Sequence, residues 1–117
     1  MYSVRLARSF ERDAKALLKK YASLRQELVT LGEELQENPT LGTPLGQDCY
    51  KIRLAIKSKG KGKSGGSRII TYAVTDNEEV ILLTIYDKQV KDNISEKELK
   101  ELIFEWNGAV ITSLHVA

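Results

Sequence analysis

One short stretch of the chain holds an unusual concentration of basic side chains. Residues 50–68 contain seven lysines and arginines and no aspartate or glutamate. The other 11 basic residues stand against all 16 acidic residues, so the rest of the chain carries a formal charge of −5 although the whole carries +2. This asymmetry predicts a polyanionic partner that binds at one place. The seven residues are Lys51, Arg53, Lys57, Lys59, Lys61, Lys63 and Arg68.

These residue types match what RNA cleavage requires when no metal takes part. The reaction needs a base to activate the ribose 2′-hydroxyl, cations to stabilise the charge on the phosphate, and an acid to protonate the leaving oxygen. Arginine holds phosphate through bidentate hydrogen bonds, and a lysine crowded by other cations gives up its proton more easily. We therefore hypothesise that Lys51 and Arg53, on one face of a strand, and Arg68, at the start of the next, surround a phosphate.

The lysines of the glycine-rich segment receive a binding role only. Glycine neighbours leave them no fixed geometry, so we expect mobile electrostatic contacts with RNA and not catalysis. They are Lys57, Lys59, Lys61 and Lys63. For Tyr86, near the end of a predicted strand, a structural role in the sheet is an equal alternative to a catalytic one.

Metal and thiol chemistry are not expected. Cys49 is the only cysteine and His115 the only histidine, so the chain cannot assemble a thiolate cluster or a histidine metal site. No residue near Cys49 in the sequence pairs with it as a base. We expect neither a metal nor a cofactor, and we assign no role to either residue.

The elements that position the basic residues follow from hydrophobic spacing. A short strand is expected at 2–6. Helical periodicity begins at about Ser9, which is expected to cap the first turn, and continues in a second helix over 24–35. Asn38–Pro39 ends that helix, because the residue before proline avoids helical dihedral angles. Residues 40–49 contain two glycines and a proline without any period, so a loop is expected there.

Three strands are expected after this loop. Residues 50–57 alternate apolar and basic side chains, which is typical of a strand that buries one face. Residues 58–67 have no apolar anchor and predict a flexible basic loop. The β-branched stretches 68–75 and 80–86 flank the polar turn 76–79 and predict an antiparallel hairpin.

A third helix is expected to close the fold. Ser95 and Glu98 form a capping-box pattern, and the apolar stripe that follows is expected to end near Gly108. Residues 109–117 form an apolar tail to which we assign no role. The order β-α-α-β-β-β-α predicts an α+β fold, with all helices packed on one face of a mainly antiparallel four-stranded sheet.

The whole chain sets the outer limits of this interpretation. With 117 residues, 42% of them hydrophobic and 29% charged, it is expected to fold as one domain over residues 1–117. No apolar run approaches the ~20 residues that a membrane-spanning helix needs. We therefore expect a cytoplasmic protein.

Five segments resemble the toxins of the RelE/ParE superfamily. The sheet motifs are DCYKIRL (48–54), GKSGGSRIITY (62–72) and LLTIYDK (82–88). The helical segments SFERDAKALLKKYASL (9–24) and ISEKELKEL (94–102) are also similar to the family's first and closing helices. Each motif alone is common, but their order and spacing together carry the resemblance over most of the chain.

The resemblance implies a function and several residue roles. RelE-type members bind the ribosomal A site and cut messenger RNA, so it implies an mRNA interferase, an endoribonuclease that inhibits translation. Lys51, Arg53 and Arg68 match the basic strand positions, although Arg53 stands where the best-known members have lysine and would be a poorer base. Tyr86 and Lys88 match the catalytic positions past the fourth strand in a less certain register.

The resemblance also implies partners and leaves alternatives open. The basic loop looks like that of HigB-type toxins and is expected to dock on ribosomal RNA. A cognate antitoxin is expected to cover the basic face of the sheet. The main alternative is a ParE-like inhibitor of DNA gyrase with no nuclease activity, and the other is a catalytically dead homologue that only sequesters a partner.

Overall fold

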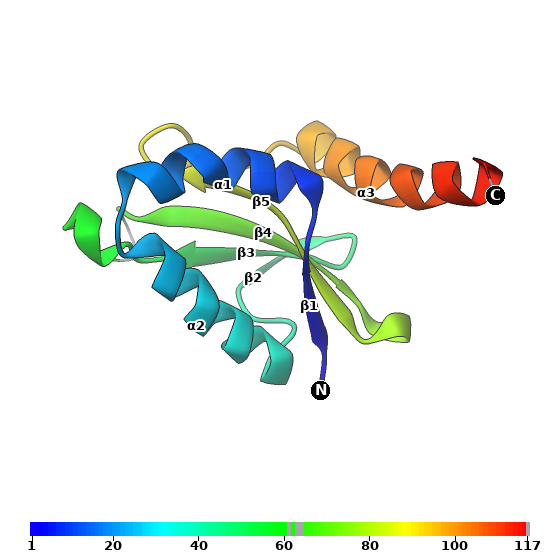
Figure 1. Ribbon diagram of the computed structural model, residues 1–117, viewed down its shortest axis with the longest axis horizontal. Coiled ribbons are helices and arrows are strands. Elements are labelled where there is room, and N and C mark those ends of the chain that lie inside the picture. The colour runs from blue at the N-terminus through cyan, green and yellow to red at the C-terminus, as the bar shows by residue number, and fades with distance from the viewer. Residues whose placement is uncertain (61, 63–64, 117) are drawn as a thin grey trace.

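The computed structural model describes residues 1–60, 62 and 65–116, with side chains as far as Gly108. Figure 1 shows α1 running along β5, and α3 extending beyond the sheet toward the C-terminus. The elements in chain order are β1 (Ser3–Leu6), α1 (Arg8–Lys20), α2 (Leu24–Glu37), β2 (Thr43–Gly46), β3 (Cys49–Leu54), β4 (Ser67–Val74), β5 (Glu79–Asp87) and α3 (Glu96–Val116). Short 3-10 helices over Lys57–Lys59 and Thr75–Asn77 precede β4 and β5.

The sheet has five strands in the order β1-β5-β4-β3-β2. β1 pairs with β5 in parallel, with Ser3 beside Glu79, and the other neighbours are antiparallel. The α+β class and the hairpin of β4 and β5 are confirmed, but the four-stranded sheet was one strand short. The missed strand, β2, has only four residues and includes Pro44. Proline is tolerated there because β2 lies at the edge of the sheet, so its sequence reads as a loop.

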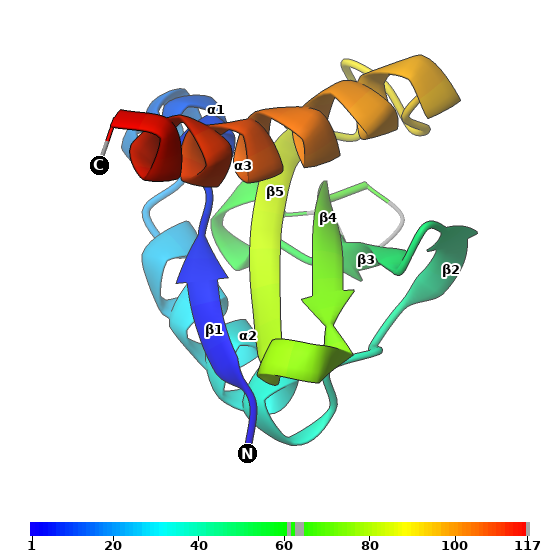
Figure 2. The same ribbon diagram turned by 90° about the vertical axis from the view of Figure 1, so that its right-hand side faces the viewer.

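Two apolar cores lie on opposite faces of this sheet. Ile69, in β4, packs with residues of α1 and α2, including Phe10 and Leu24. The next residue, Ile70, belongs to a second core with Leu99 of α3. Because successive strand residues point to opposite faces, the α1–α2 hairpin and α3 cover different faces; Figure 2 shows α3 in front of the sheet and α2 behind it. The expectation that all helices share one face was therefore wrong.

Two of the predicted helix boundaries are confirmed. Helix α2 ends at Glu37 with Asn38 as its C-cap residue, as the following proline requires. At the start of α3, the backbone N–H of Glu98 donates to Ser95 Oγ at 3.1 Å, and Glu98 Oε1 accepts from the Ser95 backbone N–H at 3.4 Å. This reciprocal pair is the predicted capping box.

Two other boundary predictions were wrong. Ser9 does not cap α1, because Ala7 is the N-cap residue and Ser9 Oγ donates to the carbonyl of Leu83 in β5 at 2.5 Å. Ser9 instead ties α1 to the sheet. Helix α3 continues past Gly108 to Val116, so the backbone of the tail 109–116 is helical. A single glycine costs a helix only about 1 kcal/mol, which is too little to end it by itself.

No helix in the described part of the chain is long and apolar enough to cross a bilayer.

Candidate active site

A row of three polar side chains crosses the central strands of the sheet. Arg53 of β3 lies directly opposite Arg68 of β4, and Arg68 lies directly opposite Tyr86 of β5. Directly opposed residues on neighbouring strands share one face of the sheet. Lys51 shares this face because it precedes Arg53 by two residues in β3. The structure thus brings four of the predicted site residues to one face.

Burial changes sharply along this row. Arg53 is exposed, whereas Arg68 is only 2% exposed and Tyr86 is 7% exposed. Arg68 Nε donates to Asp92 Oδ1 at 2.9 Å, and Arg68 Nη1 donates to the carbonyl of Ser67 at 3.3 Å. A guanidinium buried to this degree needs acceptors, because an unpaired buried charge is strongly destabilising. Asp92 therefore supplies a negatively charged acceptor for Arg68.

Asp92 belongs to a segment, residues 88–95, that joins β5 to α3 and lies over the row. Tyr86 Oη donates to the backbone carbonyl of Asp92 at 3.4 Å. Lys51 Nζ donates to Asn93 Oδ1 at 2.9 Å. Arg68, Tyr86 and Lys51 are thus all bonded to two consecutive residues, Asp92 and Asn93. The connecting segment is part of the site and not only a linker.

The charges at this site shift two pKa values. Partial burial by itself would raise the pKa of Asp92, but the hydrogen bond and charge of Arg68, with the charges of Lys51 and Lys88, lower that pKa below its ordinary value. Burial, reinforced by the Asp92 charge, raises the pKa of Tyr86 to about 12 against the opposing effect of Arg68. At neutral pH, Asp92 is therefore a carboxylate and Tyr86 a neutral phenol.

Lys88 and Lys91 both lie near the row, but they are held differently. The backbone N–H of Lys88, just beyond β5, donates to the carbonyl of Gly66 at 3.1 Å. Lys91 Nζ pairs with Glu98 Oε2 at 2.7 Å and lies 4.8 Å from the centroid of the Tyr86 ring. Lys91 is thus neutralised by α3, whereas Lys88 adds its charge to the site.

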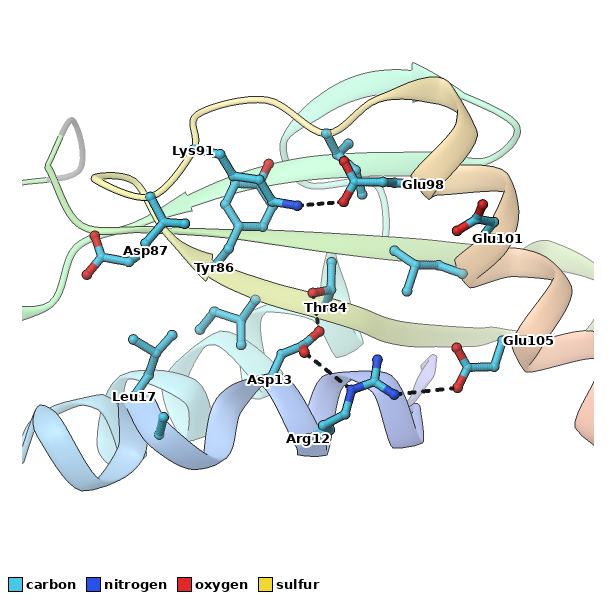
Figure 3. A pocket seen from close by; sticks show the side chains of 15 residues that line it. Arg12, Asp13, Leu17, Thr84, Tyr86, Asp87, Lys91, Glu98, Glu101 and Glu105 are labelled. Carbon is cyan, nitrogen blue, oxygen red and sulfur yellow. Dashed lines mark hydrogen bonds and ion pairs between the residues drawn. The ribbon is translucent and has the colours of Figure 1, made fainter.

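A groove of about 520 Å³ lies between α1, β5 and α3, and Tyr86 is one of the residues that line it (Figure 3). Its acidic lining residues are Asp13, Asp87, Glu98, Glu101 and Glu105, against Arg12 and Lys91. Asp13 Oδ2 accepts a hydrogen bond from Thr84 Oγ1 at 2.6 Å, and Arg12 Nη1 lies 4.0 Å from Glu105 Oε1. Excess negative charge disfavours a nucleic-acid backbone, so we do not place RNA in this groove.

The lysines of the basic loop divide into two groups. Lys57 is exposed, although its backbone N–H donates to Glu27 Oε2 at 2.7 Å. Lys59 is not, because its side chain is 5% exposed and its Nζ pairs with Asp87 Oδ1 at 2.6 Å. The expectation of a mobile contact was therefore wrong for Lys59. Lys61 and Lys63 lie outside the described residues.

Asp87 accepts three bonds at the end of β5. Besides Lys59, it accepts from Tyr21 Oη at 3.2 Å and from the backbone N–H of Gln89 at 2.9 Å. Burial by itself would raise the pKa of Asp87, but these hydrogen bonds and the charge of Lys59 lower it below its ordinary value. Asp87 thus joins α1, the basic loop and the 88–95 segment at one point.

Sequence reasoning missed Asp87, Asp92 and Asn93. All three follow or end β5, where polar residues read as an ordinary turn. No spacing within the chain links Asp92 to Arg68, which is 24 residues away. For Gly66 the sequence did offer a signal, the GKSGG motif. In the structure, a Cβ added at Gly66 would collide with the carbonyl of Leu54. The last glycine of the GKSGG motif therefore permits a close approach of two backbones.

The residues that the structure describes contain no group of three or more His, Cys, Asp or Glu side chains that could hold a metal ion. Burial, with a smaller contribution from the charge of Asp48, raises the pKa of Cys49 to about 12. The side chain of His115 lies outside the described part of the chain.

Solved structures from Escherichia coli share this fold. The toxin in the intact RelBE toxin–antitoxin complex is similar with a TM-score of 0.58 and 20% identity, over 74% of this chain and 96% of that one. An arginine-to-alanine double mutant of RelE in the free state matches with a TM-score of 0.55 and 19% identity, over 93% of this chain and 97% of that one. The isolated RelE toxin gives a TM-score of 0.54 and 21% identity, over 87% and 96%.

At these identities the likeness establishes the fold alone. The family assignment comes from the sequence: residues 4–108 match the model of a family described as the RelE toxin of the RelE/RelB toxin–antitoxin system. The matched range spans all of the strands except Ser3 of β1, helices α1 and α2, and α3 as far as Gly108. The chain therefore belongs to the RelE toxin family.

Proposed function

We propose that this protein is the toxin of a type II toxin–antitoxin module and a metal-independent endoribonuclease that cuts messenger RNA on the ribosome. The observation that supports this most directly is the row formed by Arg53, Arg68 and Tyr86, with Lys51 on the same face. Cations and a proton-carrying phenol on one rigid sheet match the needs of phosphodiester cleavage. Family membership makes RNA the expected substrate.

The residues divide into phosphate ligands and proton carriers. Arg53 and Arg68 hold the scissile phosphate, since guanidinium groups stabilise developing negative charge without losing their own proton. Tyr86, whose pKa is raised to about 12, is protonated at neutral pH and suits the acid that protonates the leaving oxygen. Lys51 and Lys88 are the candidates for the base, a role that requires the neutral amine when the 2′-hydroxyl proton is taken.

The basic loop contributes affinity and not chemistry. Lys57, together with Lys61 and Lys63, is assigned to contacts with ribosomal RNA. Lys59 instead anchors the loop through Asp87. Contacts of the first kind are electrostatic and independent of sequence, so they place the toxin without choosing the cleavage position.

The cognate antitoxin is assigned to the basic face of the sheet. The complex solved for the E. coli relative shows that a toxin of this fold is held by an antitoxin. A partner that covers Lys51 and Arg53 must present negative charge, and its affinity should fall with rising salt.

The test is to express single-site variants and score growth arrest, then add each purified variant to translating ribosomes and map cuts in the message. Lys51→Ala is expected to abolish both growth arrest and cleavage. Arg25→Ala removes an exposed cation on α2, on the opposite side of the sheet, and is the matched control. Retained cleavage by Lys51→Ala would remove the proposed site. Inhibition of gyrase supercoiling, with no cuts on ribosomes, would support the ParE-like alternative.

A further inference from the structure

The carboxylate of Asp92 lies where a phosphate would have to bind. It is the acceptor for Nε of Arg68, at 2.9 Å. Arg68 itself is 2% exposed, whereas the Asp92 side chain is 44% exposed. Asp92 is therefore the solvent-exposed member of a pair whose other member, Arg68, is buried.

The charges around Asp92 are not balanced. The charges of Arg68, Lys51 and Lys88 all act on its carboxylate, and Arg53 stands beside Arg68. One carboxylate thus meets the charges of three cations, and Arg53, the strand neighbour of Arg68, has no ion pair among the described residues. An RNA phosphate in place of Asp92 would meet the same cations without rearranging the strands.

The 88–95 segment carries little apolar anchorage of its own. Val90 is 79% exposed, Asn93 is exposed, and Ile94 is the member of the segment that packs against a core. The other contacts that hold the segment are polar. Side-chain bonds join Lys51 to Asn93, Tyr86 to the Asp92 carbonyl and Lys91 to Glu98, and backbone N–H groups of residues 88–91 donate to Gly66 and Asp87. Segments with few buried apolar contacts open at low free-energy cost. Strands β4 and β5 beneath the segment, by contrast, are buried along nearly their whole length.

We propose that Asp92 is an internal phosphate mimic: in the free toxin its carboxylate occupies Arg68, and the 88–95 segment must shift for RNA phosphate to replace it. This inference rests on the proposed function, because it takes the Arg68 site to be the site of the scissile phosphate. The exchange never leaves the buried guanidinium without an anion. The segment thus acts as a latch that lowers the affinity of the free toxin for RNA.

The consequence for affinity follows from a two-state equilibrium. If RNA binds only the open form, the apparent Kd equals the intrinsic Kd divided by the open fraction. Asp92→Asn keeps the size of the side chain but removes the charge that holds the segment over Arg68. An open fraction of about one tenth in the wild type would make the variant bind about 10-fold more tightly.

The experiment measures binding of a fluorescein-labelled RNA oligonucleotide with 2′-O-methyl groups at every ribose, which prevents cleavage. Fluorescence anisotropy gives its Kd for wild type, Asp92→Asn and Asp76→Asn at one salt concentration. Asp76 is exposed in the turn before β5, so its substitution makes the same change in net charge away from the site. We expect several-fold tighter binding for Asp92→Asn than for Asp76→Asn. Equal or weaker binding would overturn the latch and leave Asp92 as a residue that merely positions Arg68.

Two further measurements cover the case in which Asp92→Asn does not fold. Asn93→Ala removes the bond to Lys51 without touching Arg68, and is expected to tighten binding by a smaller factor. In Val90→Cys, an environment-sensitive label can be attached to the new thiol on the segment. Labelling is selective, because Cys49 is 1% exposed and its raised pKa keeps it unreactive. The label should change its emission when the oligonucleotide binds. An unchanged label together with unchanged affinity of Asn93→Ala would also overturn the latch.

The latch and the nuclease can fail separately. If Asp92→Asn binds more tightly but no variant cuts messages on ribosomes, the latch stands and the proposed function falls. If wild type cuts and Asp92→Asn shows no gain in affinity over Asp76→Asn, the nuclease stands and the latch falls.

Discussion

Arg53 and Lys59 belong to the same basic stretch of sequence, but the structure places them in opposite environments. Arg53 lies in β3, an internal strand of the sheet, and is exposed. Lys59 lies in the glycine-rich connection, yet its side chain is 5% exposed and is paired with Asp87. Whether a cation lies in a strand or in a glycine-rich connection therefore does not decide whether it can reach RNA. A nearby carboxylate decides it, because a buried ion pair removes its cation from solvent.

The largest expected effect comes from breaking the Lys59 pair. Asp87→Asn leaves Lys59 buried without a counter-charge, and we expect a loss of about 3 kcal/mol in the free energy of unfolding. Urea denaturation followed by far-UV circular dichroism measures it. Adding Lys59→Met to Asp87→Asn should restore part of the loss, since no unpaired charge then remains. A loss below about 1 kcal/mol for Asp87→Asn would mean that Lys59 is solvated after all.

The same pair should make stability depend on pH in a defined direction. The pKa of Asp87 is lowered in the folded protein, so its contribution is present above the unfolded-state pKa, about 3.9. That contribution is lost as the pH falls through the lower folded-state value. The stability difference between wild type and Asp87→Asn should therefore stay constant from about pH 7 to pH 5 and shrink below about pH 4. A difference that grows on acidification would contradict the pairing.

The smallest expected effect on stability comes from the exposed cation. Arg53→Ala should change the free energy of unfolding by no more than about 0.5 kcal/mol. It should also lower the slope of log Kd against log salt by about 0.7 for a single-stranded oligonucleotide. Lys59→Met is expected to behave in the reverse manner, with reduced stability and an unchanged slope. If both variants change the slope alike, the contrast between the two cations does not hold.

Much of this fold was predictable because local spacing carries it. The α1–α2 hairpin, the end of α2 at Asn38 and the capping box at Ser95 depend on residues within a few positions of one another. The alternation in β3 also placed Lys51 and Arg53 on one face. β2 and the second half of α3 were missed, since an edge strand with Pro44 and a helix that continues through Gly108 both go against local propensity.

The candidate site also has some features that the sequence predicts and others that only the fold determines. The sequence by itself determined that cations gather at one place, because strand alternation puts Lys51 and Arg53 on one face and Arg68 opens the strand that follows. Only the tertiary structure decided which of those cations are available. Asp92 covers Arg68 and Asp87 buries Lys59 across 24 and 28 residues of chain. Such pairings depend on how β5 and the segments around it fold back over the sheet, and no local period of the sequence encodes that path.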